Sequence, residues 1–233
     1  TDAIIGSAFG SAGERCMAIS VAVCVGKKTA ENLKTKLLEE ASKLKVGPYT
    51  DEKSDFGPLN NKAHYEKVLG YIDTGEKEGA KLLADGRNMK LQGYENGYFV
   101  GPTIFDEVKP EMKIYKEEIF GPVLSMMTTD SYEEALKLVN DHELGNGAAV
   151  FTKSGMIAKH FTENAKIGMI GVNVPIPVPV AYHSFGGWKR SLFGDHSMHG
   201  PEGVRFYTKL KTMTSRWPSG SRSNPEFVMP IMK

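Results

Sequence analysis

The sequence has little cysteine and almost no net charge. Only two of its 233 residues are cysteines, Cys16 and Cys24, and both fall on one short extended segment. A disulfide framework is therefore disfavoured, and we expect a reducing compartment. The formal net charge is +1, from 29 basic and 28 acidic side chains. Nothing in this balance favours nucleic acid or a membrane surface as partner.

Long apolar runs are also missing. No run approaches the roughly 20 residues that a membrane-spanning helix needs. The chain opens at Thr1 with no initiator methionine and no signal or transit peptide pattern. We therefore expect it to begin inside a longer protein. The composition, 40% hydrophobic and 24% charged, is that of a globular domain with a substantial core.

Strand-like and helix-like segments alternate along most of the chain. Residues 17–25 alternate between two apolar or small faces, which predicts a buried central strand. Residues 30–44 carry a leucine and alanine stripe at helical spacing, and Ser131 with Glu134 makes a capping box. Further strands are predicted at 80–86, 121–129, 147–152 and 168–174, and further helices at 63–79, 132–141 and 155–165. This alternation predicts an α/β fold with a mostly parallel sheet flanked by helices.

The C-terminal third has a different pattern. Prolines interrupt residues 175–187, so we expect a stiff loop at the carboxyl end of a strand, where α/β sheets bind ligands. Residues 204–217 alternate in polarity and stand apart from the βα units, which predicts a strand that pairs with another sheet. We therefore divide the chain into a catalytic α/β domain at 1–203, an arm strand at 204–217 and a C-terminal tail at 218–233 that docks elsewhere.

Cys16 is the first candidate for chemistry. It follows the charged pair Glu14 and Arg15 just before the first predicted strand, whereas Cys24 sits among valines and is typical of a core residue. A neighbouring cation and free N–H groups at a loop-to-strand junction favour the thiolate, which is the reactive form. From these residues alone, a reactive Cys16 and a small packing residue stay equally open.

Other patterns are weaker. Glycines 6, 10 and 13 lack the spacing of a phosphate-binding loop, and close helix packing explains them better. Residues 116–123, KEEIFGPV, have the composition of a helical turn with its stop signal, although their acid and aromatic could also hold a sugar diol and a flat ring. The histidines near residues 183–199 have no cysteine pair beside them, so we expect no metal site.

Taken in order, these motifs resemble the aldehyde dehydrogenase superfamily. GERC precedes a strand, and EEIFGPV, GVNV and SFGGWKRS follow it. The similarity runs from Gly6 to the end and is closest to the CoA-acylating methylmalonate-semialdehyde dehydrogenase branch. It rests on GSAFGSAGERCMA, GYENGYFVGPTI, YKEEIFGPVL, GVNVPIPVPV, FYTKLKTMTSRW and FVMPIMK. The resemblance implies a catalytic domain with an oligomerisation arm, and an N-terminal NAD-binding domain that is absent from this chain.

The resemblance also implies roles for five residues. Cys16 would be the nucleophile that attacks the aldehyde, and its main-chain N–H would help to hold the oxyanion. Arg15 would bind a substrate carboxylate, and Phe185 with the proline loop would line the substrate pocket. Glu118 would accept hydrogen bonds from the nicotinamide ribose, and Phe120 would pack near the nicotinamide.

The activity implied by the resemblance is NAD-dependent oxidation of malonate or methylmalonate semialdehyde, as in valine catabolism. Coenzyme A would be the co-substrate that takes the acyl group from a cysteine thioester, giving acetyl-CoA or propionyl-CoA with loss of carbon dioxide. The implied partners are a small semialdehyde and further copies of the chain in a dimer or tetramer. Two alternatives stay open. One is a hydrolytic aldehyde dehydrogenase with another substrate, and the other is an inert domain that assembles through residues 204–217.

Overall fold

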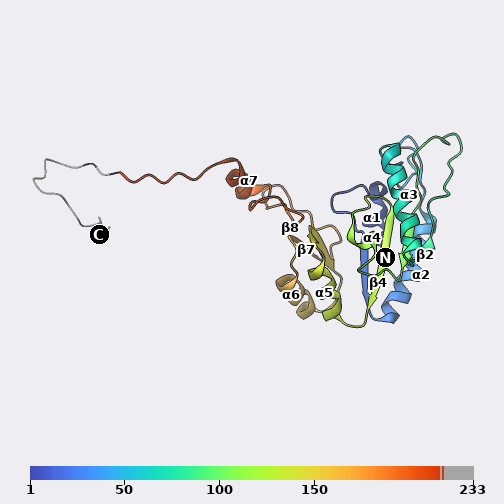
Figure 1. Cartoon of the computed structure of the whole chain (residues 1–233), viewed down its shortest axis with the longest axis horizontal. Coiled ribbons are helices and arrows are strands. Elements are labelled where there is room, and N and C mark those ends of the chain that lie inside the picture. Colours follow the sequence, from blue (N-terminus) through green and yellow to red (C-terminus); the bar gives the residue numbers. More distant parts are fainter. Residues whose placement is uncertain (216, 218–233) are drawn as a thin grey trace, which may run out of the picture.

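The largest sheet of the structure has four strands in the order β1–β4–β3–β2. A computed structural model describes residues 1–215 and 217 (Figure 1). Strands β1 and β3 run parallel to the central β4, and β2 runs antiparallel to β3 at one edge. The strands are β1 (Val21–Val25), β2 (Lys81–Ala84), β3 (Thr103–Asp106) and β4 (Val123–Thr129).

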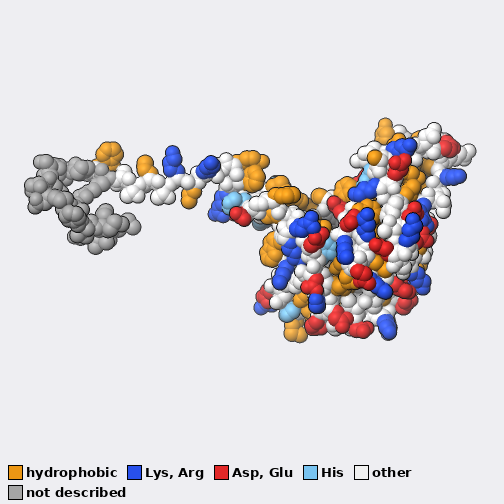
Figure 2. Space-filling view, in the orientation of Figure 1, with side chains coloured by type: hydrophobic (Ala, Val, Ile, Leu, Met, Phe, Trp, Pro, Cys, Tyr) orange, Lys and Arg blue, Asp and Glu red, His pale blue; other side chains and the backbone are white. Residues whose placement is uncertain are grey.

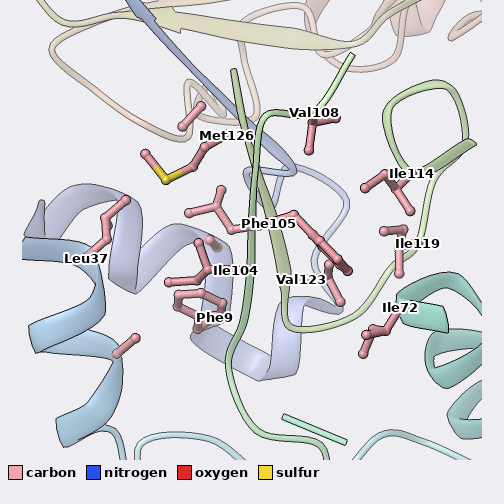
Figure 3. Close-up of a cluster of buried hydrophobic side chains, with 14 of the residues drawn as sticks. Phe9, Leu37, Ile72, Ile104, Phe105, Val108, Ile114, Ile119, Val123 and Met126 are labelled. Atoms are coloured by element: carbon pink, nitrogen blue, oxygen red, sulfur yellow. The ribbon is translucent and has the colours of Figure 1, made fainter. Parts of the chain in front are cut away.

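Helices α1, α2 and α3 pack against this sheet and enclose its core. They span Asp2–Phe9, Lys27–Lys43 and Lys62–Lys77, and α1 continues into the short helix η1 (Gly10–Gly13). Figure 3 shows Phe9, Leu37 and Ile72 from these helices around Ile104 and Phe105 of β3. All five side chains are almost fully buried. Burial of each such side chain contributes about 2–3 kcal/mol to folding, so this core fixes the loops at the strand ends.

A second, smaller unit follows β4. Strand β6 (Gly147–Val150) pairs in parallel with β7 (Met169–Val172), beside the helices α5 (Tyr132–Asp141) and α6 (Gly155–Asn164). The predicted capping box opens α5, since Ser131 Oγ accepts the Glu134 N–H at 3.2 Å. Strand β5 (Leu144–Gly145) pairs antiparallel with β8 (Trp188–Lys189). The predicted α/β fold with mostly parallel strands is therefore confirmed, although the strands of the described residues divide among three sheets rather than one.

The structure contradicts part of each of two strand predictions. Residues 17–25 form a strand only from Val21 onward, and β1 is an edge strand, because β4 is its only partner in the described part of the chain. The predicted arm strand begins as helix α7 (Gly200–Tyr207), which has a proline in its first turn and an acidic side chain, Glu202, near its N-terminus. These two features favour a helix start and override the alternation in polarity.

Residues 208–215 continue from α7 as an exposed segment that leaves the body of the molecule (Figure 1). This segment forms no strand pair within residues 1–215 and 217, so pairing with another sheet stays a prediction. Figure 2 shows hydrophobic side chains along it and over α7. The predicted tail at 218–233 lies outside the described residues. Within the described residues, no helix has the length and apolar character needed to cross a bilayer.

Two glycines let the loop before Cys16 touch the loop before β4. Gly13 has a φ of +72°, as expected for a turn, and a Cβ there would overlap the carbonyl oxygen of Gly121. A Cβ on Gly121 would in turn lie 2.7 Å from Cγ2 of Val68 on α3. Only glycine allows backbone to approach backbone this closely. Helix packing, the predicted reason for Gly13, is therefore wrong: this glycine serves a contact between two loops.

Gly13→Ala should lower the free energy of unfolding of the full-length protein by about 3 kcal/mol, because the new methyl group meets both a left-handed backbone and a carbonyl oxygen. Chemical denaturation followed by circular dichroism measures this loss. The control is Gly70→Ala on α3, where a Cβ has open space around it. That variant should be as stable as the parent or slightly more stable. Equal losses in both variants would contradict the proposed contact.

Candidate active site

Cys16 lies in a tight turn between η1 and β1. The Ala18 N–H donates to the Arg15 carbonyl oxygen at 3.0 Å, which closes the turn around the cysteine. Asn146, in the loop before β6, donates from Nδ2 to the Cys16 carbonyl oxygen at 3.0 Å. The Cys16 side chain is exposed. The backbone of this residue is therefore held from two sides while its thiol stays accessible.

Cys24 has the opposite environment. Its side chain is only 3% exposed, and burial raises the pKa of its thiol to about 11. The nearby carboxylate of Asp106 adds to this shift, and the Lys34 ammonium opposes it. Cys24 is the core residue that its valine neighbours predicted. The exposure of Cys16 excludes the packing alternative for that residue, and its role as nucleophile stays a prediction.

Four of the five predicted site residues line one pocket. Arg15 and Cys16 come from the turn before β1, and Glu118 and Phe120 come from the loop before β4. The other lining residues are Gly13, Ala18, Ile19, Ser20, Ile119, Gly121 and Val123. The pocket volume is about 30 Å³, which exceeds the roughly 10–15 Å³ that a cavity needs in order to hold one water molecule. It has room for a small group such as a carbonyl, with Cys16 beside it.

The Arg15 guanidinium is exposed near the mouth of this pocket. Its Nε donates to Ser11 Oγ at 3.0 Å, and its Nη1 would lie 3.1 Å from a Cβ on Gly10. Arg15 forms no ion pair with any residue in 1–215 or 217. Its remaining N–H donors can therefore take a carboxylate from outside the chain. Helix packing, the predicted reason for Gly10 and Gly6, is wrong, since Gly10 faces Arg15 and Gly6 has open space around it.

The loop that carries Glu118 and Phe120 is not helical. Helix α4 (Lys113–Lys116) ends before it, so the predicted helical turn over residues 116–123 is wrong. Ile119 is buried and anchors the loop, whereas Glu118 is exposed. Phe120 has a φ of +60°, which is unusual for a side-chain-bearing residue. The buried Ile119 and the turn at Phe120 explain why the segment does not continue α4.

Phe185 is not among the residues that line this pocket. It forms an antiparallel bridge with Met198, and its ring lies 5.6 Å from that of His199. The proline-rich loop before it, residues 175–184, forms no strand, as predicted. The role of Phe185 in substrate binding stays a prediction. No group of three or more potential metal ligands lies within the described ranges.

Two polar residues near the pocket were missed by the sequence analysis. Asn146 holds the Cys16 carbonyl oxygen, and His64 on α3 contacts the Phe120 carbonyl oxygen at 2.6 Å. Each contacts a residue that is far away in the sequence. The sequence around Asn146 has only the pattern of a turn, and that around His64 only the pattern of a helix. No local pattern could have identified either one.

Comparison with known proteins gives a family for this chain. The aldehyde dehydrogenase family model matches residues 1–213. A malonate-semialdehyde dehydrogenase of Pseudomonas aeruginosa is 56% identical over 231 residues, which cover 99% of this chain and 46% of that protein. The mitochondrial, acylating methylmalonate-semialdehyde/malonate-semialdehyde dehydrogenase of Bos taurus is 49% identical, with 98% of this chain and 43% of that protein covered.

A solved structure from Sinorhizobium meliloti, assigned as a methylmalonate-semialdehyde dehydrogenase and complexed with NAD, is 57% identical with a TM-score of 0.91. The match covers 94% of this chain and 45% of that one. The present chain thus spans less than half the length of the relatives it matches. The match of the family model over most of the sequence, together with these identities, establishes that the chain belongs to the aldehyde dehydrogenase family.

Proposed function

We propose that this chain supplies the nucleophile side of the active site in an NAD-dependent, CoA-acylating dehydrogenase of malonate or methylmalonate semialdehyde. The observation that carries the proposal is the pocket that the exposed Cys16 lines together with Glu118 and Phe120. The names of the relatives from Pseudomonas aeruginosa and Bos taurus support the substrate class and the acylating reaction. The full-length protein would work in a bacterial cytoplasm or a mitochondrial matrix.

The residues around the pocket fit the nicotinamide end of NAD. The exposed Glu118 carboxylate is an acceptor that can bind both hydroxyls of a ribose, and the half-buried Phe120 offers an aromatic edge beside it. The relative from Sinorhizobium meliloti is complexed with NAD, which supports this cofactor. When bound, NAD supplies the acceptor for a hydride. Glu118 and Phe120 would hold that acceptor near the Cys16 thiol.

Cys16 would attack the carbon of the aldehyde as a thiolate. A C–S bond forms, and the carbonyl π electrons move to oxygen, where the Cys16 N–H can stabilise the oxyanion. This N–H makes no backbone hydrogen bond within residues 1–215 and 217, so it is available. As the oxyanion electrons re-form the carbonyl, the C–H bond breaks and its electron pair leaves as hydride. The acyl group is then held on Cys16 Sγ as a thioester.

Arg15 would bind the carboxylate of the semialdehyde while the adjacent Cys16 attacks the aldehyde carbon. The two residues are neighbours in one closed turn, which suits a substrate whose two functional groups are a short distance apart. Once the thioester has formed, its carbonyl can take up the electron pair released when the β-carboxylate leaves as carbon dioxide. The α-carbon of the resulting enolate then takes a proton from water, which restores the thioester. The CoA thiolate would then attack the remaining acyl carbon and release Cys16.

We also propose that the full-length protein is a homo-oligomer and that residues 204–217 contribute to its assembly. Helix α7 and the segment after it expose Phe206, Tyr207, Leu210 and Met213, which are between 55% and 99% exposed (Figure 2). An array of exposed apolar side chains on an extended segment is typical of a surface that another subunit covers.

Iodoacetamide at pH 7.5 should modify Cys16 about a hundredfold faster than Cys24, because only the first thiol is exposed and the second has its pKa raised to about 11. Raising the pH toward 11 should speed modification of Cys24, since its thiolate forms only there. Peptide mapping by mass spectrometry over time measures both rates. Similar slow rates at neutral pH would remove Cys16 as the nucleophile.

Arg15→Leu should raise the KM of the full-length enzyme for malonate semialdehyde about tenfold, because the carboxylate loses its partner. The KM for propanal, which has no carboxylate, should change less than about twofold. Arg190→Leu is the matched control, since the exposed Arg190 pairs with Glu143 and does not line the pocket. Equal increases of KM for both aldehydes in Arg15→Leu would show that this arginine does not bind the substrate carboxylate.

The full-length protein with malonate semialdehyde and NAD should form NADH steadily only when CoA is supplied, because the acyl group otherwise stays on Cys16. The change in absorbance at the NADH band, with and without CoA, measures this dependence. An equal steady rate without CoA would favour the hydrolytic alternative.

A further inference from the structure

His64 lies between the two loops that form the pocket. Its Nε2 is 2.6 Å from the carbonyl oxygen of Phe120 and 3.3 Å from Oε1 of Glu14. The side chains of His64 and Glu14 are only 14% and 16% exposed. The backbone of His64 is fixed as well, because its N–H donates to the capping side chain of Asn61 at 2.9 Å. One imidazole at the start of α3 therefore reaches both loops from a fixed position.

The direction of these contacts follows from chemistry. A carbonyl oxygen and a carboxylate both accept hydrogen bonds, so Nε2 of His64 must carry the hydrogen and donate it. The shorter bond goes to Phe120, and Glu14 is the second acceptor. One helical turn further along α3, Lys67 Nζ donates to the Glu118 carbonyl oxygen at 3.3 Å. Helix α3 thus holds two carbonyl groups of the loop that carries Glu118 and Phe120.

Phe120 is the residue of this loop that most needs an external partner. Its φ of +60° is a conformation that persists in a residue with a side chain only where the surroundings fix it. The His64 ring also meets the Phe120 ring edge to face, with centroids 6.0 Å apart. On the other side, Glu14 stands two residues before Cys16 and also accepts the Asn60 N–H at 3.4 Å.

We propose that His64 is a positioning residue that holds the Phe120 backbone in its left-handed conformation and locks the loop of Glu118 and Phe120 to the turn of Cys16. This inference rests on the proposed function, because the loop it positions is the one assigned to the nicotinamide end of NAD. His64 is not among the residues that line the pocket, so it acts through Phe120 and Glu14.

The test uses the full-length protein and the variants His64→Leu, which fills the space without a donor, and His64→Gln, which keeps a neutral donor. The readout is the NAD concentration that protects Cys16 from iodoacetamide, which needs no aldehyde and no turnover. His64→Leu should require about tenfold more NAD, and His64→Gln should stay within about threefold of the parent. The matched control is His160→Leu on α6, whose ring contacts Tyr132 Oη at 2.9 Å.

The steady-state constants give a second readout. In His64→Leu the KM for NAD should rise about tenfold while the KM for the semialdehyde stays within about twofold, since Arg15 is untouched. A merely structural role would lower the melting temperature without this split. If His64→Leu does not fold, Glu14→Gln replaces it, with an expected rise of about threefold in the protecting NAD concentration.

Unchanged protection by NAD in a folded His64→Leu protein, or in Glu14→Gln where it is used, would overturn the inference. Absence of any NAD protection in the parent protein would overturn both this inference and the cofactor part of the proposed function. Protection by NAD in a parent that does not oxidise malonate semialdehyde would overturn the proposed substrate alone. The NAD protection measured in the His64 variants would then still decide the role of His64.

Discussion

The close approach of backbone to backbone at Gly13 and Gly121 is the constraint on which the site depends. A side chain at Gly13 would separate the turn before β1 from the loop before β4, and one at Gly121 would push that loop away from Val68 of α3. The two loops lie at the ends of neighbouring parallel strands, and parallel pairing brings them to the same edge of the sheet. The sheet topology brings the two loops near each other, and the missing side chain of Gly13 lets its backbone contact that of Gly121. Cys16 and Glu118 can then line the same pocket.

The two cysteines show how position alone decides the chemistry of a side chain. They are eight residues apart in number, yet Cys16 is exposed in a turn and Cys24 is buried in β1. Burial and a neighbouring carboxylate keep the Cys24 thiol protonated at neutral pH. A second reactive thiol close to the first would compete for electrophiles. The fold avoids this competition by packing Cys24 against the core that α2 covers.

Local patterns predicted the regular parts of the fold well. The leucine stripe of α2 and the capping box of α5 are set by neighbours in sequence, so their signals are complete within a short window. The edge position of β1 was not predictable, because it depends on which strands are present to pair with it. Helix α7 was not predicted because the signals that start it, Pro201 and Glu202, lie before the segment whose polarity alternates. For the site, the motifs gave Cys16 and Glu118 as candidates, and their roles stay predictions. Asn146 and His64 act through contacts that only the folded chain creates.

The amide of Asn146 gives the turn of Cys16 a second attachment with a different origin. The turn is adjacent to the Gly13 contact on the four-stranded sheet, whereas Asn146 comes from the unit of β6 and β7. A rotation of the smaller unit relative to the larger sheet would thus act on the Cys16 carbonyl group, and on the neighbouring Met17, through the Asn146 amide. The position of the Cys16 backbone is in this way set jointly by the larger sheet and the smaller unit.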